Sequence, residues 1–474
     1  MDTQKLRQRI LDLAIRGKLL PQDPNDEPAS VLLDRIRAEK ERLIAEGKLK
    51  RPKAKKSTDK SHYQNFTPPF DIPESWQWVK IDEIASSNIG LTYSPQDIVD
   101  DGVPVYRSNN IRDNKICLDD IVYVSCPILE KQYLNNGDLL ICARNGSRRL
   151  VGKNVIIENL ERPTSFGAFM AVCRSCYNPW IKLLLDSAYF NSYLDESNST
   201  AINQITQKML LDFILPLPPK EEQSRIISAF HSIVGVIDGI DQSKKNLSES
   251  IANLKSKILD LAMQGKLVPQ DPADEPAAEM LRRVNPKAKI ITDNPHSWNI
   301  PNTWTWCQLG DIFQHNTGKA LNSSNRDGIE YEYITTSNVY WNRFELDDLK
   351  KMPFKKNELE KCTVRHGDLL VCEGGDVGRA AIWNLDRNIM IQNHLHRLRP
   401  IANEIHIPLY YHVFRHYKDK DLIGGKGIAL QGFSSKSLHQ LAIPLPPYNE
   451  QKRIVAKIEE LYSVLDQIEA SLQS

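Results

Sequence analysis

The sequence predicts an α+β protein: two mixed α/β domains separated by a long antiparallel two-helix coiled coil, arranged as a circularly permuted internal repeat. One observation is that Trp76 recurs as Trp304, an offset of 228 residues. A second is that Ile-Leu-Asp-Leu-Ala at 10–14 recurs at 258–262, an offset of 248 residues. Because the offsets differ, the second copy is completed only by passing from the C-terminus to the N-terminus. The two domains are therefore expected to be pseudo-two-fold related, which suits a ligand that repeats along a line, such as DNA.

Length and composition indicate an ordinary globular protein. The chain has 474 residues, enough for roughly three domains, and 41% of them are hydrophobic. No stretch approaches the ~18 continuous apolar residues of a membrane span, so we expect a cytoplasmic protein without a membrane partner. Only Cys173 and Cys176 form a Cys-x-x-Cys pair among eight cysteines, and buried or incidental thiols are favoured over a zinc site.

Two long stretches carry the coiled-coil pattern. From Lys220 to about Gln264, apolar residues recur at spacings of four and three, with a break at Lys244. A second stripe runs to the C-terminus and continues at the N-terminus. Connectivity predicts that the two stripes pack antiparallel, as a spacer of at most roughly 65 Å. A helix lying on a globular domain would not explain the stripe twice. The predicted seam residues are Leu6, Ile10, Ile226, Phe230, Ile237, Leu247, Leu254, Ile258, Ile454, Ile458, Leu461 and Leu465.

Each long helix is predicted to end in a Gly-Lys-Leu, Pro-Gln-Asp-Pro turn, at 17–24 and 265–272, since Gly and Pro stop helices. A short helix should follow at about 29–46 or 276–284. The basic stretch Lys48–Lys60 is interpreted as an exposed linker, with DNA contact as the alternative.

The two intervening domains are predicted to mix short strands with one helix apiece. The helices fall near 179–194 and 405–417. The candidate strands are Val103–Tyr106, Leu139–Cys142, Val155–Ile157, Tyr331–Ile334, Leu369–Cys372 and Ala380–Trp383.

A search for catalytic motifs finds no convincing set. Leu445-Pro446-Pro447-Tyr448 mimics the Asn/Asp-Pro-Pro-Tyr motif of amino-methyltransferases, but a leucine cannot accept a hydrogen bond from an adenine amino group. The glycine-rich runs at 374–378 and 424–427 fit neither dinucleotide nor phosphate loops. The histidine pairs His394/His396 and His412/His416 are expected to be structural or DNA-facing, and no metal site is predicted.

Both domains instead carry hydrogen-bonding side chains in loops at equivalent places. Arg pairs with guanine, Asn or Gln with adenine and Glu with cytosine in the major groove. A solvated polar loop is the alternative for any single residue, but the paired set favours base reading. One loop is cationic in the first domain and acidic in the second, so the two are expected to read different sequences. The candidate DNA-binding residues are Arg107, Asn109, Asn110, Arg144, Asn145, Ser147, Arg148, Arg149, Lys153, Asn203, Gln204, Lys208, Lys319, Thr335, Thr336, Ser337, Asn338, Glu373, Asp376, Arg379, Lys426, Gln431 and Lys436.

Charge argues that such a reader does not act alone. The formal net charge is +1, and residues 62–219 carry 13 basic against 18 acidic side chains. Phosphate neutralisation dominates DNA affinity, so partner subunits are expected to supply many phosphate contacts.

The motifs together resemble the specificity (S) subunit of Type I restriction-modification systems. They are Pro-Leu-Pro-Pro-x-x-Glu-Gln-x-x-Ile at Pro216–Ile226 and Pro444–Ile454, the Gly-Asp-Leu-Leu turns at 137 and 367, the Ile-Pro-x-x-Trp-x-Trp segments and the permuted repeat. The resemblance implies five regions: 1–65, an N-terminal conserved helical segment and linker; 66–215, target-recognition domain 1; 216–296, a central conserved region with the spacer helix; 297–443, target-recognition domain 2; and 444–474, a C-terminal conserved helix.

The same resemblance implies a non-catalytic chain whose two domains each read one half of a bipartite, asymmetric site in double-stranded DNA. Two methyltransferase subunits would dock on the helices, and two restriction subunits would complete the nuclease. The chain itself would hold no cofactor, since S-adenosylmethionine, ATP and magnesium belong to the partners. Half-sites read from one face would lie about one helical turn, ~10 base pairs, apart. The alternatives are an autonomous DNA methyltransferase or nuclease, a coiled-coil scaffold that does not bind DNA, and a partner that fuses methyltransferase and nuclease.

Overall fold

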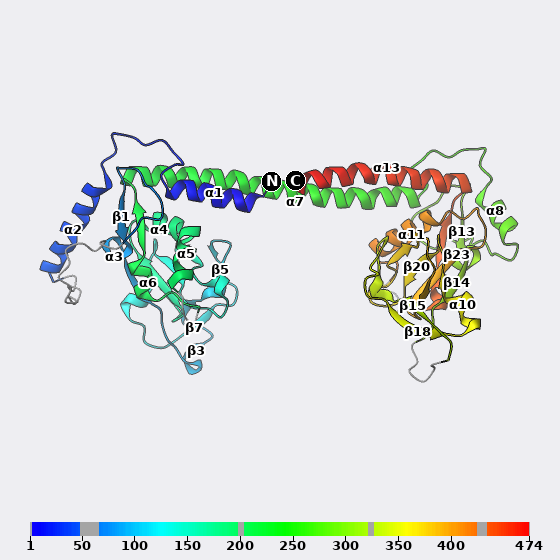
Figure 1. Ribbon diagram of the computed structural model, residues 1–474, viewed down its shortest axis with the longest axis horizontal. Helices are drawn as coiled ribbons and strands as arrows, with labels where there is room; N and C mark the ends of the chain where they lie inside the picture. Colours follow the sequence, from blue (N-terminus) through cyan, green and yellow to red (C-terminus); the bar gives the residue numbers. More distant parts are fainter. Residues whose placement is uncertain (1, 48–65, 198–202, 321–326, 424–433, 474) are drawn as a thin grey trace. The chain divides into compact units, whose positions relative to one another are not determined.

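The computed structural model describes residues 2–47, 66–197, 203–320, 327–423 and 434–473, so the predicted linker Lys48–Lys60 lies outside the described residues. The chain divides into a first unit, Asp2–Gln242, and a second unit, Ser243–Ser474. Each unit combines one mixed α/β domain with part of a long helix, as the α+β prediction requires (Figure 1). No helix among the described residues is long and apolar enough to cross a membrane.

The first unit begins with helices and continues into short strands. Its elements are α1 (Thr3–Ile15), α2 (Ala29–Ala45), β1 (Gln77–Lys80), α3 (Ile81–Ile84), β2 (Ser86–Ile89), β3 (Ile98–Val99), β4 (Val103–Tyr106), β5 (Ile111–Arg112), β6 (Lys115–Ile116), β7 (Val122–Val124), β8 (Leu139–Cys142), β9 (Asn154–Ile156), β10 (Ser165–Phe166), β11 (Met170–Arg174), α4 (Asn178–Leu185), α5 (Ala188–Ser197), α6 (Gln207–Asp212) and β12 (Ile214–Leu217). These strands form sheets of order β10-β4-β7-β3 and β2-β11-β8-β9 and the ribbons β1-β12 and β5-β6.

The second unit repeats this plan. Its elements are α8 (Ala277–Val284), β13 (Thr305–Gln308), α9 (Leu309–Ile312), β14 (Phe313–Thr317), β15 (Ile329–Ile334), β16 (Val339–Tyr340), β17 (Arg343–Phe344), β18 (Lys350–Phe354), α10 (Lys356–Cys362), β19 (Thr363–Val364), β20 (Leu369–Cys372), β21 (Ala380–Ile382), β22 (Ile389–Ile391), β23 (Leu395–Pro400), α11 (Ile407–Asp419), α12 (Ser435–His439), β24 (Ala442–Leu445) and α13 (Tyr448–Gln473). The sheets are β14-β23-β20-β21 and β18-β15-β22-β19, with the ribbons β13-β24 and β16-β17.

The predicted strands are present with small shifts of their ends, but the prediction of one helix per domain is wrong. The stretch 179–194 forms two helices, α4 and α5, which meet at Ser187. The hydroxyl of Ser187 donates to Leu184 O at 2.6 Å and accepts from Phe190 N at 3.3 Å, so it ends one helix and starts the next. The stretch 405–417 forms α11 as one helix.

The helix α7 (Lys220–Met263) is continuous over 44 residues and contributes to both units (Figure 1). In the first unit its initial half lies beside α1, where Arg7 pairs with Asp238 at 2.6 Å. In the second unit its final half lies beside α13, where Lys255 pairs with Asp466 at 2.6 Å. Gln22, which follows α1, donates to Glu222 near the start of α7. Gln270, which follows α7, donates to Glu450 near the start of α13. Both pairings are therefore antiparallel, as predicted.

The predicted seam holds at several positions and is wrong at two. Ile226, Ile237, Ile454 and Ile458 are buried, and Leu6, Ile10, Phe230, Ile258, Leu461 and Leu465 are partly buried. Leu247 and Leu254 are 40% and 51% exposed. Leu247 lies in the middle of α7, between the stretch whose Asp238 and Asp241 pair with α1 and the stretch whose Lys255 pairs with α13. At the next heptad Lys255 faces α13 instead, with its stem along the helix and its ammonium on Asp466 and Glu469.

The repeated Pro-Leu-Pro-Pro-x-x-Glu-Gln segments join each domain to its helix by the same hydrogen bonds. In the first unit the indole N–H of Trp76 donates to buried Glu222 at 2.9 Å, and the amide of Gln223 donates to Pro218 O at 2.9 Å. Burial raises the pKa of Glu222, although the bonds from Trp76 and Gln22 oppose the shift.

The second unit repeats these hydrogen bonds, and we call the bonded group of residues around Glu222 or Glu450 the node. Trp304 donates to Glu450 at 2.9 Å, Gln270 donates to the other oxygen of that carboxylate at 2.5 Å, and Gln451 donates to Pro446 O at 2.9 Å. Burial likewise raises the pKa of Glu450. The two sequence offsets meet at this node, because Gln22 and Gln270 follow one offset and the other partners follow the second. The circular permutation is therefore visible as shared geometry within each unit.

The glycines that follow α1 and α7 are required by their backbone conformation and by a close proline. Gly17 and Gly265 have φ of +66° and +64°, and a Cβ at either position would lie about 2.5 Å or less from Pro73 or Pro301. Only glycine both adopts this left-handed conformation freely and allows the proline to approach.

Candidate nucleic-acid interface

The polar loops of the first domain meet at one place. Asn145 Nδ2 donates to Ser108 Oγ at 3.2 Å, Asn203 Nδ2 donates to Gly146 O at 3.2 Å, and Arg144 forms an isolated β-bridge with Gln204. Segments that start at 107, 144 and 203 are thus adjacent in the fold. The sequence predicted these residues, and the structure brings them together.

Arg107 and Asn109 share a carboxylate that the sequence analysis did not single out. Arg107 Nη2 donates to Asp120 Oδ2 at 3.1 Å, and Asn109 Nδ2 donates to the same oxygen at 2.6 Å. The side chain of Asp120 is 70% exposed, and its backbone φ of +57° turns the chain sharply. Both hydrogen-bonding side chains are therefore held in fixed directions beside an accessible acid.

Asn110 has a different role from the one expected. It is fully buried, its Oδ1 accepts from Arg107 N at 2.9 Å, and its Nδ2 donates to Cys117 O and Asp119 O. In the second domain Asn338 makes the corresponding bonds, accepting from Thr335 N at 2.9 Å and donating to Glu345 O at 2.9 Å. Both asparagines therefore hold their loops together by hydrogen bonds to the backbone. Full burial assigns Asn110 to the loop framework, whereas Asn338 is partly exposed and its contact with a base stays a prediction.

The remaining candidates of the first domain have mixed surroundings. Arg148 pairs with Asp195 at 2.6 Å, which directs its guanidinium toward α5. Asn145 Oδ1 accepts from Ser147 N at 3.0 Å. Arg149 is exposed, Lys153 is partly buried, and Lys208, in the first turn of α6, is 77% exposed.

The second domain places acidic and hydroxyl groups at the equivalent positions. Thr335 Oγ1 and Ser337 Oγ lie 2.7 Å apart, and Arg379 Nη2 donates to Thr336 O at 2.7 Å. The guanidinium of Arg379 also lies 5.0 Å from the Tyr340 ring centroid. These groups form a compact polar loop cluster, as the sequence predicted.

Two acidic candidates of this domain have basic neighbours. Glu373 lies 3.6 Å from His394 Nδ1, and Asp376 lies 2.9 Å from Lys418 Nζ. The side chains of Glu373 and Asp376 are 29% and 39% exposed, so both remain partly accessible to a ligand.

Of the remaining candidates, Lys319 forms internal contacts, and two others lie outside the described residues. The ammonium of Lys319 donates to Pro353 O and to Glu358, both at 2.7 Å, and its side chain is only 8% exposed. That charge is satisfied internally, so we do not retain Lys319 in the interface. Lys426 and Gln431 lie outside the described residues. Lys436, in α12, is exposed.

The cysteines and histidines of the pairs noted in the sequence differ in burial. Cys173 is buried and Cys176 exposed, and burial raises the pKa of Cys173 to about 12. Within the described ranges no group of three or more His, Cys, Asp or Glu could hold a metal ion. His412 and His416 are buried, whereas His394 is largely exposed beside Glu373.

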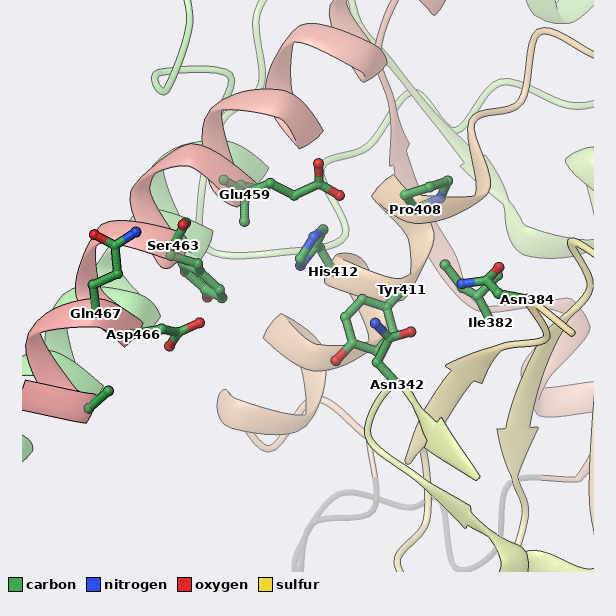
Figure 2. Close-up of a pocket in the computed structure, with 13 residues that line it drawn as sticks. Asn342, Ile382, Asn384, Pro408, Tyr411, His412, Glu459, Ser463, Asp466 and Gln467 are labelled. Carbon is green, nitrogen blue, oxygen red and sulfur yellow. The ribbon is translucent and has the colours of Figure 1, made fainter. Parts of the chain in front are cut away.

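A groove lies between α11 and α13 within the second unit. It has a volume of about 690 Å³, and Figure 2 shows Tyr411 and His412 on one wall facing Glu459, Ser463 and Asp466 on the other. Tyr411 and His412 also line an adjoining hollow of about 380 Å³ that reaches α7.

Comparison with known proteins identifies the architecture. A family model described as "Type I restriction modification DNA specificity domain" matches residues 73–249 and 301–474. The chain is 27% identical to the Type I restriction enzyme EcoEI specificity subunit of Escherichia coli, covering 99% of this chain and 91% of that protein. It is 26% identical to the EcoAI specificity subunit of Escherichia coli, covering 98% and 90%.

Solved structures show the same fold. The chain matches the HsdS subunit from Thermoanaerobacter tengcongensis with a TM-score of 0.53 and 18% identity, covering 85% of this chain and 95% of that one. A chain solved in a study of complex assembly and conformational transition of the type I R-M system gives a TM-score of 0.58 and 18% identity, covering 85% and 94%.

Proposed function

The chain belongs to the family of Type I restriction-modification DNA specificity subunits. From this premise we propose which of its surfaces read DNA, set the half-site separation and dock the partner subunits. As such a subunit it is non-catalytic, and S-adenosylmethionine and ATP belong to its partners. This membership excludes both an autonomous methyltransferase or nuclease and a scaffold unrelated to DNA. The open questions are where it reads DNA, what sets the half-site separation, and where its partners dock.

The loop cluster of each domain reads one half of a bipartite site through the major groove. The observation that carries this assignment is that equivalent loops on matching frameworks hold different side chains. Arg107, Asn109 and Arg144 in the first domain offer donors for guanine and an amide for adenine, whereas Glu373 in the second offers an acceptor for the cytosine amino group. Two such readers on domains 66–215 and 297–443 specify an asymmetric site.

Methylome sequencing of cells that carry this chain and its partner genes tests the assignment. The expected result is one motif in two unlike parts, separated by a constant unspecific gap. Replacing the loop 144–153 should change only one part, because that loop belongs to one domain. A single uninterrupted motif, or a change in both parts, would contradict the proposal.

The continuous helix α7 fixes the length of the gap between the half-sites. It joins the two domains without a break, and each half of it is braced by an antiparallel helix in its own unit. An insertion of four residues near Lys244, about one helical turn, should lengthen the preferred gap without changing either half-site. Inserting the same residues into the surface turn at Asp271 is the control, and an unchanged gap in the helix variant would refute the spacer role.

The helical surfaces dock the methyltransferase subunits. Supporting this, α7 and α13 expose apolar side chains: Leu254 and Val464 are 51% and 52% exposed. Large exposed apolar side chains grouped on an element often mark a protein interface. The adjoining groove, with Tyr411 and Asp466, adds polar partners (Figure 2).

Copurification with the methyltransferase measures this docking. Leu254→Glu should reduce copurification at least tenfold, since it places a charge in a desolvated contact. Asn253→Glu carries the same charge change at the neighbouring exposed position and should have little effect. If both variants copurify as much methyltransferase as the wild-type chain does, the docking surface lies elsewhere. Two methyltransferase and two restriction subunits, in the cytoplasm, complete the proposed complex.

A further inference from the structure

An exposed aromatic residue stands among the polar loops of the first domain. Phe169, in the turn between β10 and β11, is 61% exposed. Its carbonyl accepts hydrogen bonds from Ala143 N at 2.9 Å and Arg144 N at 3.0 Å, and the turn is closed by Met170 N donating to Gly167 O at 2.8 Å. The backbone is therefore held firmly while the ring projects outward.

The ring borders a hollow of mixed character. The hollow, of about 480 Å³, is lined by the apolar side chains of Leu91, Tyr93, Phe169 and Met170 and by the predicted base-reading segment 107–109. The guanidinium of Arg144 lies 5.5 Å from the centroid of the Phe169 ring. An apolar floor rimmed by directed hydrogen-bonding groups is an arrangement that receives a small apolar group at a defined place within a polar surface.

The second domain has the same backbone arrangement with different chemistry. His394 O accepts from Glu373 N at 2.9 Å, just as Phe169 O accepts from Ala143 N, so His394 occupies the place of Phe169. His394 Nδ1 lies 3.6 Å from Glu373 Oε2. An aromatic hydrocarbon beside a cation in one domain thus corresponds to an imidazole beside a carboxylate in the other.

We propose that Phe169 and its hollow receive the C5-methyl group of a thymine in the first half-site, whereas the His394–Glu373 pair reads a base pair in the second half-site by hydrogen bonds alone. In the major groove the thymine methyl is the apolar feature among the base edges, and the other groups there are hydrogen-bond donors and acceptors. The neighbouring Arg107 and Asn109 then read polar edges of the same or adjacent base pairs. This inference rests on the proposed function, because it requires these loops to face DNA.

Replacing thymine by deoxyuridine removes only the methyl group and tests the inference directly. Once the motif is known, each thymine of the first half-site, on either strand, is replaced singly in a duplex bound by the complete methyltransferase complex. Burial of one methyl group should change affinity by about fourfold. We expect one position at which deoxyuridine weakens binding of the wild-type complex by that factor. With Phe169→Ala the same replacement should have no effect.

Two controls keep the result interpretable. Phe169→Leu retains an apolar side chain and should preserve part of the deoxyuridine effect, which excludes a general loss of folding. His394→Ala should leave the deoxyuridine effect in the first half-site intact. If no thymine replacement couples to Phe169 while the split motif is still recognised, the methyl assignment is refuted. If the wild-type complex recognises no split motif, the proposed function itself fails.

Discussion

Acidification should destabilise the second unit selectively, because that unit holds almost all of the histidines. Apart from His62 and His231, every histidine lies between His296 and His439. His412 and His416 are buried on α11, with exposed fractions of 7% and 3%. Burial lowers the pKa of each to about 4. For His416, nearby Asp260 opposes the shift and Lys420 adds to it.

The direction follows from proton linkage. The unfolded chain protonates these imidazoles near pH 6.5, whereas the folded unit resists protonation until about pH 4. Between those values the unfolded state binds more protons, so the free energy of unfolding falls as the pH is lowered. From pH 7 to pH 5 each histidine contributes a loss of about 2 kcal/mol, and the pair about 4 kcal/mol. This loss is a large fraction of the free energy of unfolding of a typical domain, which is roughly 5–15 kcal/mol.

Hydrogen exchange measured by mass spectrometry separates the two units within one intact chain. Peptides from 243–474 should lose protection between pH 7 and pH 5, after correction for intrinsic exchange rates, while peptides from 66–197 change little. His412→Gln should reduce the difference between the units by no more than about a third, because the pKa values of His315 and His416 in the same unit are also lowered to about 4. His231→Gln, at an exposed position of α7, is the matched control. Equal loss of protection in both units, or an unchanged difference in the His412→Gln variant, would refute the reasoning.

Three further predictions concern single side chains. Trp76→Phe and Trp304→Phe each remove a hydrogen-bond donor from a buried carboxylate. In denaturant titrations each should lower the free energy of unfolding by about 1–3 kcal/mol, with similar values because the two nodes make the same bonds. Values that differ severalfold would contradict that equivalence. Asp120→Asn should raise affinity for unrelated DNA and steepen its salt dependence, because it removes the acid beside Arg107; an unchanged salt slope would argue against it. Asn110→Ala should lower thermal stability and weaken the first half-site only through disorder of its loop, so an unchanged melting temperature with altered base preference would restore a direct role.

The framework was predictable from sequence because its signals are local and repeated. The Trp76 and Trp304 positions, the two offsets and the heptad spacing specify which segments are equivalent, and the antiparallel pairing follows from connectivity. What the spacing could not show is which side of α7 faces its partner at each heptad. A lysine with a long aliphatic stem, Lys255, takes a seam position and leaves Leu254 exposed, because its ammonium finds acids on α13.

The candidate site was predictable in place and less so in detail. Asn109 and Asn110 are neighbours of the same type, yet one lies at the surface and the other is buried, and only the turn geometry distinguishes them. Lys319 is neutralised by Glu358, a partner 39 residues away that no local pattern indicates. Phe169 was missed because an apolar residue beside a strand resembles core. Its correspondence with polar His394 was the available signal.

The division between framework and reading groups has a consequence for how specificity changes. The bonds that join each domain to its helix, through Glu222 and Glu450, involve none of the side chains that we assign to base reading. Buried Asn110 and partly buried Asn338 make corresponding hydrogen bonds within the reading loops of the two domains. Substitutions at the exposed positions therefore act without disturbing the node or the spacing helix. Effects on the two half-sites should consequently add, since sites that share no partners contribute independently to the free energy of binding.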